Sequence, residues 1–362
     1  MQDWANCKNM LIVRADNIGD LLMSSPAIRA VKNKLGCKIT VLTSELAGKA
    51  AVLIPEIDEV ITAELPWVKN DSRIEPEQIA KISKKLQHKH FDACIILSVY
   101  SQNPLAAALL MWMAKIPLRL AYCRENPYEL LNYWLPEKEP YSFISHQVSR
   151  ELNLLKFIGI EPDDNDNNEI SLHIPPKHIN SMERKIKQEG INSQNPYLVF
   201  HAGVSEKKRE FPEERWIALA QEVIHLYGLP ILLTGSSAEK EMTDRLQEKI
   251  GGNCYSIAGK LNIPEFAALI SKAKLLVSVN TAAIHMAAGF QVPVIVLYAQ
   301  TNPQHKPWKV KGAVFEYSIP IYLQSENEVI GYVNKTLYAK EQPIPEVKEI
   351  ISAINRLLPV YV

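Results

Sequence analysis

Short apolar runs recur along the chain, separated by longer segments with helical periodicity. The run Leu275–Val279 is continuous and rich in β-branched residues, which is typical of a strand buried on both faces. Comparable runs lie at 10–13, 38–43, 59–62, 92–98 and 119–123, and then at 197–202, 231–234, 255–258 and 294–298. Strands that alternate with helices predict βαβ units and a parallel sheet, so we expect an α/β fold.

The alternation is interrupted once, at residues 161–169, which read EPDDNDNNE. This stretch is polar and poor in helix formers, and is therefore the best candidate for a linker. It divides the chain into a first doubly wound domain, residues 1–170, and a second of similar size, residues 171–343. A last helix is expected within 344–362.

Composition excludes several classes of protein. Forty basic and forty acidic residues give a net charge of zero, so no global field favours nucleic acid. Five scattered cysteines without a CxxC pair argue against disulfides and a zinc site, and favour a reducing compartment. The first ten residues lack the apolar core of a signal peptide, and Lys115 ends the longest apolar segment, 104–114. We expect a cytoplasmic protein, with peripheral contact to the inner membrane left open.

The strand at Leu275–Val279 leads into a predicted anion site. Asn280 and Thr281 are helix-capping types, and a short helix, 282–288, follows until Gly289. Free amides and the helix dipole at such a junction attract an anion, although an ordinary strand–helix unit has the same pattern. The first strand is followed by RADNIGD, whose single glycine excludes a dinucleotide fingerprint, and no Walker A motif occurs.

Four blocks together resemble glycosyltransferase family 9, the ADP-heptose:lipopolysaccharide heptosyltransferase-like enzymes. They are RADNIGDLLMSSP at 14–26, HAGVSEKKREFPEERW at 201–216, LLTGSSAE at 232–239, and the opening strand with NTAAIH, PVIVLY and TNPQHKPW. The resemblance implies the GT-B architecture, two Rossmann-like domains facing a central cleft, with the final helix packed back on the first domain. It also implies inverting, metal-independent transfer of a sugar from a nucleotide diphosphate to a glycan or glycolipid hydroxyl, without a cofactor. The pathway would be synthesis of lipopolysaccharide or a related cell-surface glycan.

The resemblance places the general base at Asp20, which would take the proton of the acceptor hydroxyl. An aspartate at a helix start is otherwise a common capping residue, and one side chain can do both. Asp16 is a rival carboxylate without support from the resemblance.

The same resemblance assigns the donor-binding residues to the second domain. They are Gly203, Ser205, Lys208, Arg209, Glu239, Leu261, Asn280, Thr281, Ala282 and His285. Arg209 aligns with the family's diphosphate-binding cation, and Lys208 is its neighbour; a planar guanidinium suits phosphate. Gly203 would allow close backbone approach, and Ser205 would donate to a phosphate.

Three of these residues have equally good structural interpretations. Glu239 would hold the ribose hydroxyls, but a glutamate in a first helical turn is also favoured by the dipole. Leu261 would face the base or fill the core. His285 would shape the phosphate site, although a lone histidine near an apolar face is more often structural.

Asn280 departs from the family, which carries aspartate there. An amide keeps one acceptor oxygen and drops the charge, so we expect a donor preference different from ADP-L-glycero-D-manno-heptose. Residues 122–134 are rich in aromatics, and residues 104–112 are apolar and end in Trp112; both would line an acceptor groove, or form core. Lys115, Arg119 and Arg124 would meet an anionic acceptor. Two other functions remain open: a nucleotide-sugar 2-epimerase on the same architecture, and a non-catalytic sugar-nucleotide-binding protein.

Overall fold

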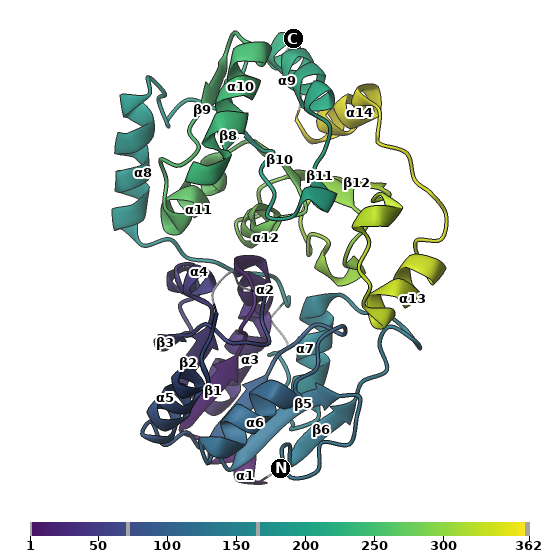
Figure 1. Cartoon of the computed structure of the whole chain (residues 1–362). Coiled ribbons are helices and arrows are strands. Elements are labelled where there is room, and N and C mark those ends of the chain that lie inside the picture. Colours follow the sequence, from purple (N-terminus) through teal and green to yellow (C-terminus); the bar gives the residue numbers. More distant parts are fainter. Residues whose placement is uncertain (1, 70–72, 164–166, 359–362) are drawn as a thin grey trace. The chain divides into compact units, whose positions relative to one another are not determined.

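The structure is a computed structural model that describes residues 2–69, 73–163 and 167–358 (Figure 1). The chain divides into two compact units, Met1–His173 and Ile174–Val362, and each is described by itself. The division falls close to the predicted boundary at residue 170. Residues 164–166 of the predicted linker lie outside the described part of the chain.

The first unit contains a parallel sheet whose six strands lie in the order β3-β2-β1-β4-β5-β6. The strands are β1 (Asn9–Val13), β2 (Lys38–Thr43), β3 (Glu59–Thr62), β4 (Ala93–Ile96), β5 (Leu118–Cys123) and β6 (Tyr133–Pro136). The central strand β4 is buried at every position, as its unbroken apolar sequence requires, because helices cover both faces of the sheet.

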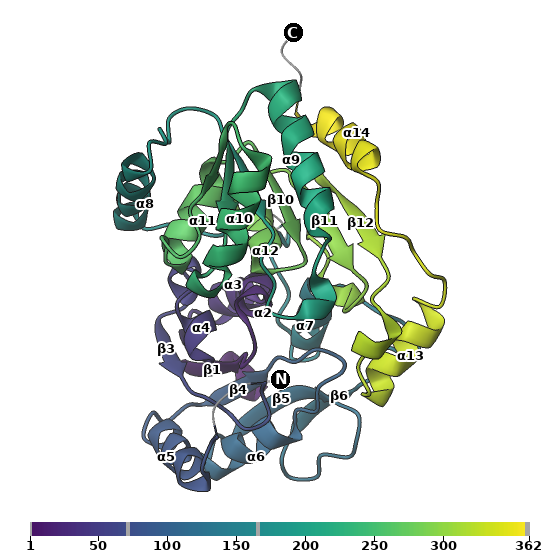
Figure 2. The same ribbon diagram turned by 45° about the horizontal axis from the view of Figure 1, so that its top comes forward.

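Helices cover the two faces of this sheet in separate layers. The helices are α1 (Gln2–Ala5), α2 (Ile18–Met23), α3 (Ser25–Leu35), α4 (Glu45–Gly48), the 3₁₀ turn η1 (Ala51–Leu53), α5 (Pro76–Gln87), α6 (Leu105–Met113) and α7 (Gln147–Lys156). α5 and α6 pack side by side on one face, where they share a core with alternate residues of the strands (Figures 1 and 2). α3 packs against α7 on the other face.

The second unit repeats the strand order of the first. Its parallel sheet runs β12-β11-β10-β7-β8-β9. The strands are β7 (Leu198–His201), β8 (Ile231–Thr234), β9 (Cys254–Ser256), β10 (Leu275–Val279), β11 (Val294–Ala299) and β12 (Gly312–Tyr317). The strand order reverses between β1 and β4 in one sheet and between β7 and β10 in the other. At such switch points, connections leave the sheet in opposite directions and a crevice opens beyond the carboxyl ends of the strands.

Helices again cover both faces in the second unit. They are α8 (Pro176–Gln188), η2 (Lys207–Arg209), α9 (Glu213–Tyr227), η3 (Ser237–Glu239), α10 (Lys240–Ile250), α11 (Ile263–Lys272), α12 (Ala282–Gly289), η4 (Pro303–His305), η5 (Ile321–Leu323), α13 (Glu328–Thr336) and α14 (Val347–Leu357). α11 packs against α8 and α12, whereas α9 packs against α10 and α14.

The prediction that the last helix packs on the first domain is wrong. α14 belongs to the second unit, where it lies beside α9 (Figures 1 and 2). Its strongly amphipathic sequence buries Ile350 and Ile354 completely in the core beneath β10 and β11. At its N-terminus, Glu346 accepts two hydrogen bonds from the guanidinium of Arg215 on α9. The apolar stripe of α14 is buried in the core of the second unit, which explains why the helix packs on that unit.

No helix among the described residues is long and apolar enough to cross a membrane.

Candidate active site

At the switch point of the first sheet, one buried arginine gathers three carboxylates. Arg14 directly follows β1 and has no solvent exposure. Its Nη2 lies 2.9 Å from Oδ1 of Asp20, and its Nη1 lies 3.4 Å from Oδ2 of Asp16. Its Nε lies 3.9 Å from Oε1 of Glu151 on α7. A fully buried guanidinium needs such anionic partners, because an unpaired charge inside the protein is very costly.

Asp20 is the third residue of α2, not its cap. The helix begins at Ile18 after the N-cap Asn17, and the backbone N–H of Asn17 donates to Oδ2 of Asp20 at 3.2 Å. The carboxylate therefore closes a capping box with one oxygen and meets Arg14 with the other. The side chain is almost fully buried and held at both oxygens, which fixes its direction. Asp20 thus takes part in the capping box as its N3 residue and also pairs with Arg14, although the cap itself is Asn17.

Asp16 links the loop after β1 to the loop after β4. Its Oδ1 accepts a hydrogen bond of 2.6 Å from Nε2 of Gln102, which follows β4. Burial raises the pKa of Asp16, with Arg14 opposing that shift and the negative charge of Asp20 adding to it. Asp16 therefore takes up a proton more readily than an ordinary aspartate.

Glu151 completes the cluster from the helical layer. Its Oε1 accepts hydrogen bonds from Oγ of Ser24 at 3.0 Å and from Nε2 of Gln147 at 2.8 Å. Complete burial raises its pKa, while Arg14 and these hydrogen bonds oppose the shift. Of the three carboxylates around Arg14, that of Asp20 lies nearest to the guanidinium.

At the switch point of the second sheet, η2 brings Arg209 to the end of β10. Nη1 of Arg209 donates to the carbonyl oxygen of Asn280 at 3.3 Å, and its Nε is buried without a partner among the described residues. The hydroxyl of Tyr317, at the end of β12, donates to the carbonyl oxygens of Arg209 and Glu210 at 3.0 and 3.2 Å. Tyr317 therefore fastens the basic turn to the sheet edge.

A carboxylate already accompanies the two candidate phosphate-binding cations. Oε2 of Glu206 lies 3.3 Å from Nζ of Lys208 and 3.3 Å from Nη2 of Arg209. All three side chains are partly exposed, so the pairs are screened and weak. An incoming diphosphate would meet cations that have an internal anionic partner.

Asn280 and α12 form the neighbouring part of this edge. Thr281 caps α12, its hydroxyl accepting from the N–H of Ala283, and Ala282 is the first residue of the helix. Nδ2 of Asn280 donates to Oγ1 of Thr301 at 2.9 Å and to the carbonyl oxygen of Ala299 at 3.4 Å. Because a carbonyl only accepts, this contact fixes which way the amide points. Its Oδ1 is buried and has no partner in the described chain.

Glu239 and Gly203 lie against each other. A Cβ at position 203 would come within 2.3 Å of Oε1 of Glu239, so any larger residue there would require the carboxylate to move. Oε2 of Glu239 accepts from the N–H of Ser236, the capping-box contact of η3. His201, at the end of β7, bonds Oγ1 of Thr234 at 2.9 Å. Burial lowers the pKa of His201, against the opposing charge of Glu239.

The three remaining predicted donor-binding residues, Ser205, Leu261 and His285, lie on different elements of the second unit. Ser205 is exposed on the loop after β7, and Leu261 is half-buried just before α11. His285 is buried on α12, with its ring centroid 6.5 Å from that of His305. Among the described residues, no group of His, Cys, Asp and Glu is arranged to hold a metal ion.

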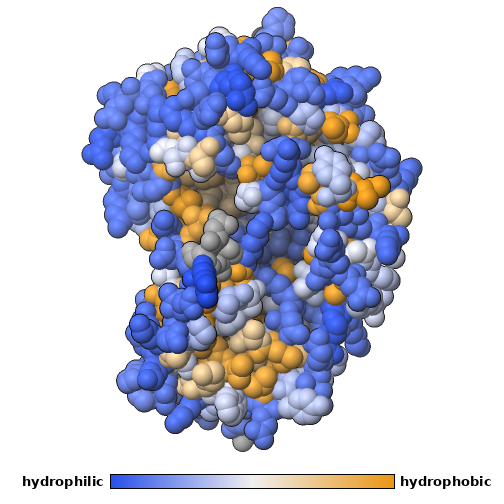
Figure 3. All heavy atoms as spheres, in the orientation of Figure 1, coloured by the Kyte–Doolittle hydropathy of each residue, from blue (hydrophilic) through white to orange (hydrophobic). Residues whose placement is uncertain are grey.

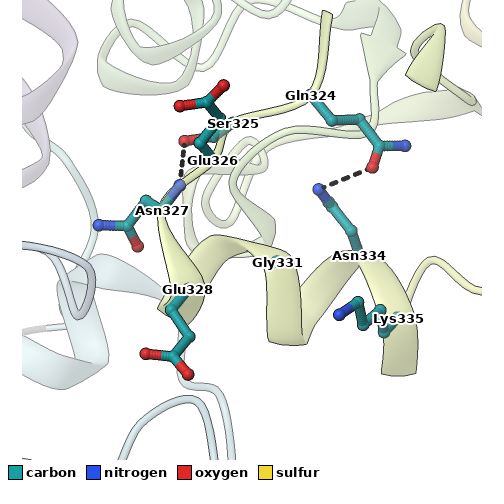
Figure 4. A pocket seen from close by; sticks show the side chains of 8 residues that line it. All are labelled: Gln324, Ser325, Glu326, Asn327, Glu328, Gly331, Asn334 and Lys335. Carbon is teal, nitrogen blue, oxygen red and sulfur yellow. Dashed lines mark hydrogen bonds between the residues drawn. The ribbon is translucent and has the colours of Figure 1, made fainter. Parts of the chain in front are cut away.

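A pocket of about 370 Å³ lies elsewhere in the second unit, around α13 (Figure 4). Asn334 donates to Gln324 across it, and Ser325 accepts from the N–H of Asn327. None of the predicted site residues lines it.

Comparison with known proteins decides the family. The profile of glycosyltransferase family 9 (heptosyltransferase) matches residues 79–324, which is more than half of the chain. The chain belongs to glycosyltransferase family 9. It is therefore a glycosyltransferase, as the four sequence blocks predicted. The family match contains every donor-side residue described above, whereas Arg14, Asp16 and Asp20 precede it.

Relatives and solved structures extend the likeness over nearly the whole chain. Lipooligosaccharide heptosyltransferase 2 of Haemophilus influenzae is 26% identical over 83% of this chain and 85% of its own. Lipopolysaccharide heptosyltransferase 2 of Escherichia coli is 23% identical over 82% and 84%. The family 9 glycosyltransferase of Veillonella parvula covers 97% of both chains with a TM-score of 0.76 and 17% identity. Escherichia coli heptosyltransferase WaaC with ADP covers 96% of this chain and 99% of its own, with a TM-score of 0.69 and 19% identity. The fold is thus GT-B, as predicted.

The structure adds residues to this glycosyltransferase site that sequence reasoning missed. In the first unit, Arg14 contacts Asp16, Asp20 and Glu151, and Gln102 contacts Asp16. In the second unit, Tyr317 holds Arg209 and Thr301 holds Asn280. The sequence offered one signal, the position of Arg14 directly after an apolar strand and just before Asp16 and Asp20. The others lie far away along the chain.

Proposed function

We propose that this glycosyltransferase moves a sugar from a nucleotide diphosphate to a hydroxyl of a lipopolysaccharide-type glycan, with inversion at the anomeric carbon. The curated relatives support the substrate class, since their names are those of lipopolysaccharide and lipooligosaccharide heptosyltransferases. The observation that carries the chemistry is the pairing of Asp20 with Arg14. A carboxylate held at both oxygens in a buried setting is oriented to receive one proton.

The proposed reaction is a single displacement. The acceptor hydroxyl oxygen forms a bond to the anomeric carbon while its proton passes to Asp20. The bond from that carbon to the phosphate oxygen breaks, and the nucleoside diphosphate leaves with the electron pair. One displacement inverts the configuration at the carbon. Arg14, which donates to Oδ1 of Asp20, would hold the carboxylate in place during the transfer.

The second unit supplies the proposed site for the diphosphate. Arg209 offers its buried, unpaired Nε, and the first amides of α12 lie next to Asn280, whose carbonyl oxygen already accepts from Arg209. Fixed positive groups of this kind stabilise charge that develops on a leaving group. Metal independence and the lack of a cofactor are part of the proposal, because these groups can supply the compensation that a cation gives elsewhere.

For the donor, we propose a nucleotide sugar of the ADP-heptose kind with an altered sugar preference. One solved structure similar in fold is described as a complex with ADP. In this chain the side chain at 280 presents one uncharged acceptor oxygen, Oδ1, in a fixed direction. Glu239 beside Gly203 would receive ribose hydroxyls. The acceptor would be a lipid-linked glycan, reached by cytoplasmic protein at the inner membrane.

A donor panel tests the proposal. Thermal shifts are measured with ADP, GDP, UDP and their sugars, because a ligand that binds only the folded state raises its melting temperature. Donors that shift the protein are then incubated with a deacylated lipopolysaccharide core, and products are analysed by mass spectrometry and NMR. We expect a glycosidic product of inverted configuration, with undiminished yield in EDTA. Retained configuration, release of an epimerised donor, or binding without transfer to any core would overturn the proposal.

A further inference from the structure

The outer face of α6 carries hydrophobic side chains that no part of its own unit covers. Leu109, Trp112 and Met113 are 45%, 47% and 42% exposed. They lie at spacings of three and four residues, so they form one stripe on the helix. The opposite side of α6 packs into the core with Ala108 and Met111. Figure 3 shows hydrophobic residues gathered on the region of the first unit where Figure 1 places α6.

The neighbouring helix adds positive charge to the same surface. α5 lies beside α6 in the layer that covers one face of the sheet, and both helices bury their inner sides in one core. Lys81, Lys84 and Lys85 are exposed and point away from that core, again at spacings of three and four. No ion pair is formed by any of the three within the described chain. The outward faces of α5 and α6 therefore present a lysine row beside an apolar stripe.

Acidic residues are scarce in these two helices. α6 contains no aspartate or glutamate, and α5 contains one glutamate, Glu77, against three lysines, Lys81, Lys84 and Lys85. The chain as a whole has equal numbers of acidic and basic residues, so this excess is local. A partner that is complementary to this surface carries negative charge opposite the lysines. It also has an apolar region into which the leucine, methionine and tryptophan side chains can insert.

We propose that the outer face of α5 and α6 binds the surface of an anionic phospholipid bilayer. Lysines would meet lipid headgroups, while Leu109, Trp112 and Met113 enter the boundary between headgroups and acyl chains. Tryptophan is favoured at this depth because its ring is apolar and its N–H is polar. Binding of this kind is interfacial, in agreement with the lack of a spanning helix among the described residues.

Vesicle flotation with the full-length protein tests the proposal. We expect wild type to float with vesicles of phosphatidylethanolamine and phosphatidylglycerol, and to partition at least about fivefold less onto pure phosphatidylcholine. The variant Leu109→Gln, Trp112→Gln, Met113→Gln should lose about tenfold or more of its partition coefficient. The variant Lys81→Gln, Lys84→Gln, Lys85→Gln should lose the preference for phosphatidylglycerol. Salt should weaken binding of wild type for the same reason.

A control removes apolar groups that are still more exposed, from the other unit. Ile321 and Tyr322 are 86% and 82% exposed, so Ile321→Gln with Tyr322→Gln should float like wild type. Failure of wild type to float, or equal loss in the control, would overturn the proposal. So would a wild-type dimer, measured by light scattering, that the α6 variant converts to monomer, since the stripe would then be covered by a second copy. Flotation needs no sugar donor, so its failure leaves the proposed transfer reaction untouched.

Discussion

Glu206 lies between Lys208 and Arg209, with Oε2 3.3 Å from Nη2 of the arginine. The candidate diphosphate site of this glycosyltransferase thus contains its own weak anionic competitor. A nucleoside diphosphate must displace that carboxylate or share the cations with it. If the donor diphosphate binds at these cations, as proposed, we expect the strength of binding to depend on Glu206, whose charge has the same sign as that of the ligand.

Glu206→Gln should strengthen binding of the nucleoside diphosphate. In this variant the diphosphate no longer has to compete with Glu206 for Arg209. Because a partly exposed ion pair is weak, the gain should be modest, and we expect the Kd to fall about two- to fivefold. Isothermal titration calorimetry at low and high salt measures this, and the gain should shrink as salt increases. Weaker binding in Glu206→Gln would show instead that the carboxylate positions the arginine.

Asp20→Asn should abolish most turnover. The amide keeps the shape of the side chain and an acceptor for the N–H of Asn17, but it cannot act as a base. We expect kcat to fall about 100-fold or more, with an unchanged Kd for the nucleoside diphosphate. Asp16→Asn is the matched control and should lose far less. If Asp16→Asn is the inactive variant and Asp20→Asn turns over normally, the base is Asp16.

Arg209→Ala should weaken diphosphate binding and slow transfer. A loss of about 2–4 kcal/mol in kcat/KM is expected if the guanidinium stabilises the leaving group. Arg209→Lys should restore part of it, because an ammonium lacks the planar fork. Steady-state kinetics of these variants and of Lys208→Ala locate the cation. A silent Arg209→Ala with a damaging Lys208→Ala moves the assignment by one residue.

Asn280→Asp should change the ranking of donor sugars. A carboxylate oxygen would replace Nδ2, which lies 3.4 Å from the carbonyl oxygen of Ala299, so the side chain must turn or be repelled. The capping geometry at Thr281 should survive, and diphosphate affinity should change little. Competition among donors, the heptose included, measures the ranking for both proteins. An unchanged ranking with the heptose preferred in each would show that position 280 does not select the sugar.

Glu151→Gln should alter how stability depends on pH. The folded-state pKa of Glu151 lies above its ordinary value of 4.5 because of burial. Deprotonation of Glu151 therefore destabilises the native protein, and this loss develops as the pH rises from the unfolded-state pKa through the higher folded-state pKa. The glutamine variant lacks that loss, so its stability relative to wild type should increase as the pH rises above 4.5. Urea unfolding at a series of pH values measures the difference, and an opposite slope would contradict the raised pKa.

The hydrophobic pattern predicted the buried centre of each sheet better than its edges. β10 and β11 are buried at every position, so their sequences are continuous apolar runs. β6 and β12 were not predicted, because they are half-exposed edge strands whose sequences include Pro136 and Glu316. The same limit applies to α13, where Val333 alone is buried.

Site residues divide in a similar way. The turn from β10 into α12, with Asn280 and Thr281 before the helix, could be predicted because capping chemistry is local. The contact of Ser24 with Glu151 joins residues 127 positions apart, and that of Arg209 with Asn280 joins residues 71 positions apart. Such pairings depend on strand order at the switch point, which spacing along the chain does not encode.

The place of α14 has a consequence for inheritance. Because the final helix completes the core of the second unit, each unit is one uninterrupted stretch of polypeptide, joined after His173. A single recombination event at that junction exchanges a whole unit without splitting a helix, a strand or a core. The unit that contains Asp20 and the unit that contains Arg209 can therefore be inherited from different ancestors.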